Sequence, residues 1–421
     1  MAAESVAWDS VPLETLAEET SPITYGVVKP GDEGEVPFVR GGDIAGGRVL
    51  IEQLRTITAE VSQQYRRTLL RGGELLVSLV GNPGQVAIAP ASLAGANIAR
   101  QVGLVRLRRG VDSGFVSYFL QSPKGQEALG AQSLGSVQQV INLRDLKTVK
   151  VPLPPLPEQK AIARILGTLD DKIELNRRMN ATLEAMARAL FQSWFVDFDP
   201  VHAKAAGRQP SDMAEKTAAL FPATFQDSEL GKIPDGWRVG SIYEAADVIY
   251  GAPFSSKQFN EDGDGKPLIR IRDLADESPG VCTPEVHPKG HMVQPGDVVV
   301  GMDGEFRAYL WGGVPAWLNQ RVCVFAPKPA YSAAFVRNSI IAPLAHVEAT
   351  ETATTVIHLG KNDIDRFKVI IPSPEIHAAF AKLCQPWYDR IVANKQQTRT
   401  LATLRDTLLP KLLSGEVEVA N

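Results

Sequence analysis

Arginine is concentrated in one span of the sequence, between Arg40 and Arg109. This span holds ten arginines, no lysine and four acidic residues, whereas residues 1–39 hold eight acidic residues and one lysine. A guanidinium group binds phosphate and the edge of guanine through paired hydrogen bonds, which suits it to nucleic acid. Because the whole chain has a formal net charge of −4, charge alone leaves two interpretations: a nucleic-acid surface, or an arginine-rich surface that faces water.

Two glycine-containing segments carry side chains that suit base edges. The first is GNPGQ, Gly81–Gln85, in which the amides of Asn82 and Gln85 match the hydrogen-bonding edge of adenine. Its glycines allow the backbone to approach a ligand closely. An ordinary hairpin turn uses the same residue types, so both interpretations stay open.

The second segment is MDGEFR, Met302–Arg307. Asp303 and Glu305 can accept a hydrogen bond from the amino group of cytosine, and Arg307 can bind guanine or phosphate. The run PGDVVVGMDG matches the earlier run GGELLVSLVG, so we expect MDGEFR to be the loop equivalent to GNPGQ.

Arg40 and Arg270 each stand three residues before an aspartate, Asp43 and Asp273 respectively. They are candidates for phosphate or base contacts and equally for ion pairs with these aspartates. Gln138, together with Ser136 and Gln139, lies shortly before a predicted helix. The complete set of candidate nucleic-acid contacts is Arg40, Arg66, Arg67, Arg71, Ser78, Asn82, Gln85, Arg100, Gln138, Arg270, Arg272, Asp303, Glu305, Arg307, Asn319, Gln320 and Arg321.

The sequence offers no complete set of residues for catalysis or metal binding. It contains no Asn/Asp-Pro-Pro-Tyr/Phe segment, with which adenine methyltransferases hold a flipped base. In DGDGKPL a proline follows Gly-Lys, where a phosphate-binding loop needs serine or threonine. Cys282, His287 and His291 lack an evident fourth ligand, so a surface loop is the better interpretation than a zinc site. We predict no catalytic residue, metal or cofactor in this chain.

Length and composition indicate a globular protein of more than one domain. A chain of 421 residues exceeds the size at which single cores stop growing, about 250–300 residues. No apolar run approaches the roughly 18 residues that a membrane span needs, and the first residues do not read as a secretory signal. The three cysteines are far apart, which does not suit a disulfide framework. We expect a cytoplasmic protein without a membrane partner.

The chain contains an internal repeat. A shift of 218 residues lays Lys150-Val151 on Lys368-Val369 and Asn176 on Asn394. Earlier segments of the two halves match more loosely. One example is PFVRGGDI in the first half, which matches PLIRIRDL in the second. Each half therefore reads as a mostly β domain followed by a long helix. We predict a first domain over residues 1–145, a helical region over 146–199, a linker over 200–232, a second domain over 233–362 and a second helical region over 363–421.

Each helical region carries a seam of apolar residues that steps by alternating fours and threes, which is typical of a coiled coil. The first seam runs from Ile162 to Trp194 and the second from Phe380 to Leu412. Two such helices can pack on each other. The predicted fold is thus α+β, with two mostly β domains alternating with two helices that form an antiparallel coiled coil about a pseudo-twofold axis.

Four polar residues interrupt the two seams. In an antiparallel pair, Asn180 would face Asn394 and Asn176 would face Thr398. Polar residues in an apolar seam cost stability but favour one register. We therefore predict that these four residues set the alignment of the helices, the alternative being that some of them face water.

Several segments, in order, resemble the specificity subunit of type I restriction-modification systems over essentially the whole chain. The resemblance rests on PLPPLPEQKAIARILGTLDDKIELNRR, FQSWFVDFDPVHAKAAGRQP, SELGKIPDGWRV, VVVGMDGEF, WLNQRV and LRDTLLPKLLSGEV. It implies two target-recognition domains that read the two halves of a split DNA site. One departure stands out: Gln159 falls on His377, so the two helices differ at their start.

The resemblance also implies partners. Two methyltransferase subunits would dock on the helices, and restriction subunits would join them on double-stranded DNA. S-adenosylmethionine, ATP and Mg would be bound by those partner subunits, and this chain would not itself be catalytic. The alternative is a scaffold that no longer reads DNA and only titrates its methyltransferase partners. A self-sufficient methyltransferase or nuclease is disfavoured, because the two domains and two helices already use the whole chain.

Overall fold

The computed structural model describes residues 8–130, 140–350, 357–417 and 419. The chain forms two compact units. Unit 1 consists of Met1–Lys172 with Leu401–Asn421, and unit 2 consists of Ile173–Thr400. Each unit combines β-sheets with a segment of each of two long helices, which confirms the predicted mixture of helix and sheet.

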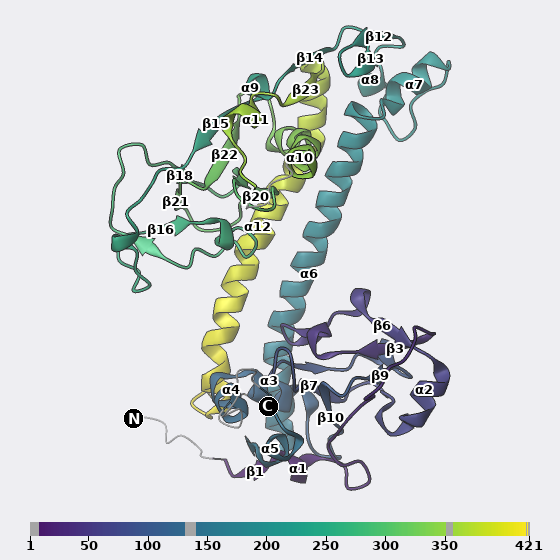
Figure 1. Ribbon diagram of the computed structural model, residues 1–421, viewed down its shortest axis with the longest axis vertical. Coiled ribbons are helices and arrows are strands. Elements are labelled where there is room, and N and C mark those ends of the chain that lie inside the picture. The colour runs from purple at the N-terminus through teal and green to yellow at the C-terminus, as the bar shows by residue number, and fades with distance from the viewer. Residues whose placement is uncertain (1–7, 131–139, 351–356, 418, 420–421) are drawn as a thin grey trace. The chain divides into compact units, whose positions relative to one another are not determined.

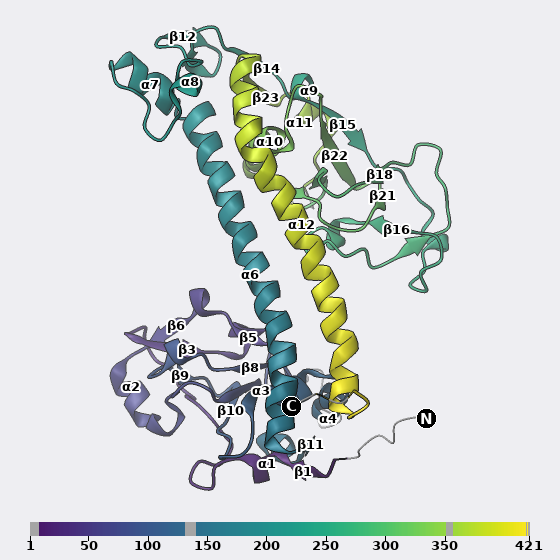
Figure 2. The ribbon, with the colours of Figure 1, turned by 180° about the vertical axis from the view of Figure 1, so that it is seen from behind.

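The long helices are α6 (Leu156–Phe195) and α12 (Pro374–Leu413), of 40 residues each. Proline stands in the first turn of both, where its missing N–H group costs no hydrogen bond. None of the predicted seam positions is exposed. Within unit 2 the two helices run side by side in opposite directions (Figures 1 and 2), since Asn176 contacts Thr398 and Asn180 contacts Asn394.

The β part of unit 1 is built on a four-stranded antiparallel sheet of order β2-β10-β7-β8, with a three-stranded sheet β6-β3-β9 beside it in the same unit. Strands β7 and β10 are buried over their whole length, which explains their continuous apolar sequence. The strands are β1 (Ser10–Pro12), β2 (Thr24–Tyr25), β3 (Val36–Val39), β4 (Ile44–Ala45), β5 (Arg48–Val49), β6 (Arg55–Ile57), β7 (Leu75–Ser78), β8 (Val86–Ile88), β9 (Asn97–Ile98), β10 (Val102–Val105) and β11 (Lys150–Pro152).

The described residues of unit 1 also form five short α-helices. They are α1 (Leu13–Leu16), α2 (Ala59–Gln64), α3 (Ser113–Gln121), α4 (Pro123–Gly130) and α5 (Leu143–Thr148). Asp112 caps α3 by accepting a hydrogen bond from the Phe115 N–H. The core of unit 1 joins Phe115 of α3 to Ile162 of α6 and Leu412 of α12, so the β part and both helices share one apolar interior.

Unit 2 has an antiparallel sheet of order β15-β22-β19-β20 and a second sheet of order β17-β16-β21-β18. Its strands are β12 (Phe225–Ser228), β13 (Gly231–Pro234), β14 (Arg238–Ser241), β15 (Ala246–Tyr250), β16 (Lys266–Ile269), β17 (Cys282–Thr283), β18 (Met292–Val293), β19 (Val298–Gly301), β20 (Ala308–Leu310), β21 (Ala316–Leu318), β22 (Val322–Pro327) and β23 (Lys368–Ile371). Its shorter helices are α7 (Asp199–Ala205), α8 (Glu215–Ala218), α9 (Ile242–Ala245), α10 (Ala333–Thr350) and α11 (Lys361–Ile364).

Residues 200–232 are folded, which corrects the expectation of a linker. They contribute most of α7, then α8, β12 and the start of the β12–β13 hairpin. Val201 and Phe221 are buried in the core of unit 2, where the Phe221 ring packs edge-on to Trp194 of α6. The segment shows no regular spacing of apolar residues because its helices and strands are short. Its few apolar residues are nevertheless enough to pack it against α6.

The two units repeat the same architecture. The strand orders of their four-stranded sheets match, and each unit pairs one strand in parallel, β3 with β9 and β16 with β21. Gly26 and Gly251 occupy matching places after β2 and β15. A Cβ atom would lie 1.8 Å from the Ile98 carbonyl oxygen at Gly26, and 2.0 Å from the Asn319 carbonyl oxygen at Gly251. Only glycine permits this close approach of two backbones.

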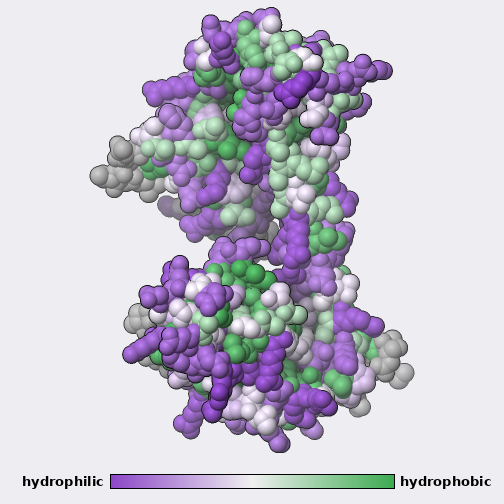
Figure 3. All heavy atoms as spheres, turned by 90° about the vertical axis from the view of Figure 1, so that its right-hand side faces the viewer, coloured by the Kyte–Doolittle hydropathy of each residue, from purple (hydrophilic) through white to green (hydrophobic). Residues whose placement is uncertain are grey.

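Every helix among the described residues is too short or too polar to traverse a lipid bilayer. Hydrophilic residues are spread over the whole face drawn in Figure 3, with smaller hydrophobic areas between them.

Candidate nucleic-acid interface

In unit 2 the candidate residues converge at the end of β19. The Met302 N–H donates to the Arg321 carbonyl at 2.9 Å, and the Asn319 N–H donates to the Ile269 carbonyl at 3.2 Å. These backbone bonds bring the loop Met302–Arg307, the turn before β22 and the end of β16 to one edge of the sheets.

Asp303 is the centre of an ion cluster at this place. Its Oδ1 lies 3.3 Å from Nη1 of Arg321 and 2.6 Å from Nδ1 of His358. The side chains of Arg321 and His358 remain 54% and 48% exposed, whereas that of Asp303 is 24% exposed. The carboxylate therefore orients two hydrogen-bonding groups that still face solvent, an arrangement suited to base edges or phosphate.

His358 was not among the sequence candidates. The shift of 218 that aligns the long helices lays His358 on Val140, so the change from an apolar side chain to an imidazole was visible in the sequence. What the sequence did not show is the contact with Asp303, which stands 55 residues earlier in the chain.

The remaining candidates of unit 2 divide by exposure. Glu305 and Arg307 form an exposed ion pair at 2.7 Å, and Arg272 and Gln320 are also exposed. Asn319 is buried, and its side-chain oxygen accepts from the Arg321 N–H, so it shapes the turn.

Arg40 and Arg270 both pair with their aspartates. Two nitrogens of Arg40 bond the two oxygens of Asp43 at 3.0 and 2.8 Å. Arg270 does the same with Asp273 at 3.1 and 3.3 Å. The structure therefore contains an ion pair at both sites, and both aspartates are buried.

Unit 1 has a corresponding edge with different side chains. The Leu79 N–H donates to the Gln101 carbonyl at 2.7 Å, as Met302 does to Arg321. The places of Asp303, Arg321 and His358 are taken by Val80, Gln101 and Val140. This edge of unit 1 thus offers an amide and apolar groups where unit 2 offers ionic ones.

The loop Gly81–Gln85 joins β7 to β8 as a hairpin. Asn82 is exposed on it and Gln85 is half-buried. Ser78, at the end of β7, is fully buried with its hydroxyl 3.4 Å from the Val80 carbonyl. The structure therefore does not support a DNA contact by Ser78, because β7 is an inner strand of its sheet and is buried over its whole length.

Two of the predicted arginines share a depression of about 470 Å³ in unit 1. Arg66 and Arg67 line it together with Tyr25, Gln63 and Gln64. The arginines and glutamines are exposed, so the depression combines positive charge with amides and an aromatic ring. The only sign of this depression in the sequence is the neighbouring pair Gln63-Gln64.

The other arginines of the span are dispersed. Arg71 and Arg100 are exposed, and Arg71 lies 3.7 Å from Glu18. Arg106 is buried and pairs with the buried Glu74. The arginine-rich span is thus only partly a surface. Gln138, together with Ser136 and Gln139, lies outside the described residues.

The four polar seam residues meet in unit 2. Asn394 Nδ2 donates to Asn180 Oδ1 at 2.8 Å, and Asn176 Nδ2 lies 3.4 Å from the Thr398 hydroxyl and 2.9 Å from Gln397 Oε1. Asn176 and Asn394 are buried. The contacts are those of the expected antiparallel alignment, and the role of these residues in setting the register stays a prediction.

Gln159 and His377 perform the same structural task. Gln159 accepts a hydrogen bond from the N–H of Asp112, the N-cap residue of α3, at 2.9 Å. His377 accepts one through Nε2 from the N–H of Ser332, just before α10, at 3.3 Å. Both side chains are buried, and burial lowers the pKa of His377 to about 4. The difference at the start of the two helices therefore lies inside the fold.

Within the described part of the chain, no group of three or more histidine, cysteine, aspartate or glutamate side chains is placed to hold a metal ion.

Comparison with known proteins places these units in a family. The family described as "Type I restriction modification DNA specificity domain" matches residues 8–185 and 234–401. The type I restriction enzyme HindI specificity subunit of Haemophilus influenzae is 26% identical over 347 residues, which cover 68% of this chain and 73% of that protein. The MjaIX specificity subunit of Methanocaldococcus jannaschii is 24% identical over 428 residues, covering 98% and 94%.

A solved structure shares the fold. The crystal structure of the type I restriction-modification system S subunit from M. genitalium superimposes with a TM-score of 0.58 at 16% identity, covering 98% of both chains. The family match spans most of the chain in two copies, and each copy covers one of the repeated β-rich domains and most of the long helix that follows it. The chain therefore belongs to the type I restriction-modification DNA specificity family.

Proposed function

We propose that this chain is the DNA specificity subunit of a type I restriction-modification complex, in which each β-rich domain reads one half of a split, asymmetric site. The observation that carries the proposal is that one family domain occurs twice, with different polar side chains at a matching edge. Asp303, Arg321 and His358 stand where Val80, Gln101 and Val140 stand in the other domain. Two domains that differ at such an edge suit two different half-sites.

The proposal assigns the long helices two tasks, to set the distance between the half-sites and to dock two methyltransferase subunits. Restriction subunits join this assembly on double-stranded DNA. S-adenosylmethionine, ATP and Mg belong to the partner subunits, and this chain supplies recognition and assembly. Two observations support this part of the proposal: the relatives are named specificity subunits of type I restriction enzymes, and α6 and α12 are 40 residues long with no exposed seam position.

Methylome sequencing tests the proposal. The chain is co-expressed with the methyltransferase encoded beside it in a host that lacks adenine methylation. We expect N6-methyladenine in a split motif with two different halves. Assembly of the complex without any sequence-specific methylation would contradict a reading function and favour the alternative, a scaffold that only titrates methyltransferase partners.

A further inference from the structure

Strand β20 is one of the two edge strands of its sheet, and it follows directly after the loop Met302–Arg307. Among the residues that the structure describes, β20 pairs with β19 alone, with Val299 opposite Tyr309. The N–H of Trp311 donates to the Asp297 carbonyl, toward β19. Carbonyl groups alternate in direction along a strand, so those of residues 308, 310 and 312 point away from the sheet. An edge of this kind is normally left to water or covered.

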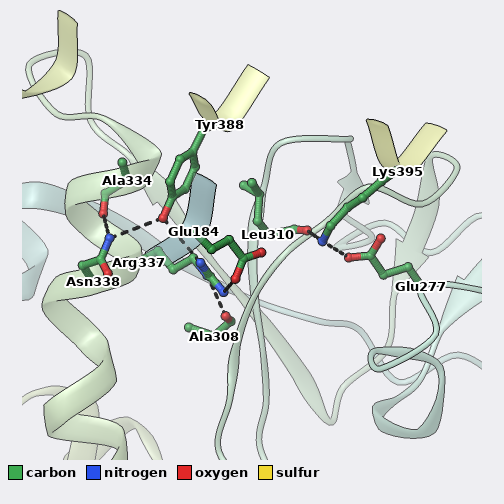
Figure 4. Close-up of polar contacts among 9 residues, drawn as sticks. All are labelled: Glu184, Glu277, Ala308, Leu310, Ala334, Arg337, Asn338, Tyr388 and Lys395. Carbon is green, nitrogen blue, oxygen red and sulfur yellow. Dashed lines mark hydrogen bonds and ion pairs between the residues drawn. The ribbon is translucent and has the colours of Figure 1, made fainter. Parts of the chain in front are cut away.

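Three cationic side chains cover these carbonyls. Arg337 of α10 donates to the Ala308 carbonyl at 2.9 Å. From α12, Lys395 donates to the Leu310 carbonyl at 2.7 Å and Arg399 to the Gly312 carbonyl at 2.8 Å. Figure 4 shows Arg337 and Lys395 reaching the two ends of β20. We call Arg337, Lys395 and Arg399 the anchor residues.

Arg337 also connects the domain to both long helices. Its Nη2 lies 3.1 Å from Oε2 of Glu184 on α6, and its Nη1 lies 3.5 Å from the Tyr388 hydroxyl on α12. The neighbouring Asn338 donates to the same hydroxyl at 3.3 Å. One residue of α10 therefore contacts the sheet edge, α6 and α12 at once, as Figure 4 shows.

The charges at this place are held away from water. The side chains of Arg337 and Glu184 are only 14% and 23% exposed. Burial by itself lowers the pKa of Arg337, but Tyr388 and Glu184 outweigh it and raise that pKa above its ordinary value. The guanidinium stays charged, and removing it would leave Glu184 half-buried without its cation.

Lys395 has a second partner in Glu277. This glutamate has a φ of +53°, a left-handed backbone conformation that costs energy for any residue other than glycine. Its carboxylate contacts Nζ of Lys395, and both side chains are largely buried. A strained residue held by an ion pair indicates that the position of this contact is closely specified.

Unit 1 connects its domain to both helices at the matching place by other chemistry. Tyr118 of α3, which corresponds to Asn338, donates to Asp170 of α6 at 2.6 Å. Arg405 of α12 donates to the other oxygen of Asp170 at 2.7 Å. A contact of three helices recurs in both units although its residues differ, which indicates that the contact itself is required.

We propose that the anchor residues are positioning residues: they hold β20, and through it the reading loop Met302–Arg307, at a defined place on the helix pair, and so restrict the number of base pairs accepted between the half-sites. This inference rests on the proposed function. Two properties of recognition are then separate. The loop determines which bases are read, and the anchor residues determine the position along the DNA at which the loop binds.

The test measures binding of the chain, assembled with its methyltransferase, to duplexes that carry both half-sites separated by the natural spacer or by one base pair more or fewer. A second set of duplexes keeps the spacer and changes one base pair in the half-site of the second domain. For Arg337→Met we expect discrimination against the wrong spacer to fall by roughly tenfold or more, because hydrogen bonds from a charged group contribute energies of that size. Discrimination against the changed base pair should stay as in the unaltered protein.

Two further variants test whether a loss of spacer discrimination in Arg337→Met could come from misfolding. The double variant Lys395→Met/Arg399→Met removes the contacts of α12 with β20 and leaves Arg337 with Glu184, and it should lower spacer discrimination in the same way. Arg337→Lys keeps the charge but has fewer donors, so it should give an intermediate result. Lys361→Met, which breaks an exposed ion pair of the same domain, is the matched control and should change neither property.

Unchanged spacer discrimination in both Arg337→Met and the double variant would overturn the inference. So would a joint loss of spacer and base discrimination in the double variant, because the anchors would then maintain the reading loop itself. The absence of any split site for the unaltered protein would instead count against the proposed function.

Discussion

His377 and Gln159 show at the residue scale how one task is performed by two side chains. Both accept a backbone hydrogen bond just before a helix of the adjoining domain. His377 is packed against the rings of Tyr331 and Phe335, each 4.6 Å away. A glutamine does not titrate, whereas the histidine must remain neutral to accept this bond.

This difference predicts a pH dependence of stability. Because the pKa of His377 is lowered to about 4 in the folded state, the unfolded chain binds a proton below about pH 6.5 that the folded chain does not. The free energy of unfolding should therefore fall as the pH decreases from 6.5 to 4, by on the order of 3 kcal/mol. His377→Gln should remove this loss, which urea unfolding of both proteins at pH 7.5 and pH 5 would measure.

The reciprocal variant is the control. Gln159→His should introduce a similar loss in unit 1, provided that the imidazole is buried as His377 is. A stability difference between His377→Gln and the unaltered protein that is equal at both pH values would contradict this account.

Arg321 and His358 should determine bases in one half-site only. Both are oriented by Asp303 and both face solvent. If Arg321 binds a base edge, Arg321→Gln should cost about 1–3 kcal/mol of discrimination at one position of the second half-site. The comparison variant is Gln101→Ala, which should affect the first half-site. Binding to duplexes with single base-pair changes gives the answer, and an equal loss for every sequence would instead identify a phosphate contact.

At the scale of elements, the helix pair has a polar layer inside an apolar seam. Asn180 and Asn394 bond to each other, and the buried side-chain oxygen of Asn176 has no hydrogen-bond partner among the described residues. Such a layer lowers stability, while misaligned helices would leave more of its groups unpaired. This is the physical reason to expect that the layer favours one register.

The double variant Asn180→Leu/Asn394→Leu should raise the melting temperature, with a gain of about 1–2 kcal/mol in the free energy of unfolding, and should broaden the distribution of distances between spin labels at positions 181 and 393. The single variant Asn180→Leu should destabilise the protein, because Asn394 then loses its partner. An unchanged or lower melting temperature for the double variant would refute the assigned role.

At the scale of the whole molecule, charge is distributed unevenly along the chain. The arginine-rich span lies in unit 1, and its exposed members include the pair in the depression beside Gln63 and Gln64. Phosphate contacts release counterions from DNA, so they are measured by the salt dependence of binding rather than by affinity at one salt concentration.

We expect the variant Arg66→Gln/Arg67→Gln, which changes the two arginines of the depression, to reduce the slope of log affinity against log salt concentration by about one unit for each arginine that contacts a phosphate. Arg108→Gln/Arg109→Gln, from the same span but outside the depression, should leave the slope nearly unchanged. Equal slopes for all three proteins would mean that the span is a solvated surface, the second interpretation of its charge.

The sequence by itself determined the features that depend on local spacing. The shift of 218 residues predicted the repeated units, and the seam from Ile162 to Trp194 predicted a helix whose stripe is covered, because side chains three and four residues apart share one face of a helix. The sequence also predicted that Asn180 would contact Asn394, because only one register of an antiparallel helix pair places the polar seam residues opposite each other. The structure contains this contact.

Only the tertiary structure determined which polar residues are exposed at the surface and which are buried in the interior. Composition could not separate Arg106, which is buried on Glu74, from Arg66, which is exposed. Ser78 was a candidate DNA contact near the loop Gly81–Gln85, and the structure places it fully buried at the end of β7. The contacts of Asp303 with His358, and of Arg337 with Ala308 and Glu184, join segments far apart in the chain. Such contacts depend on how sheets and helices pack against each other. The spacing of residues along the chain therefore cannot predict them.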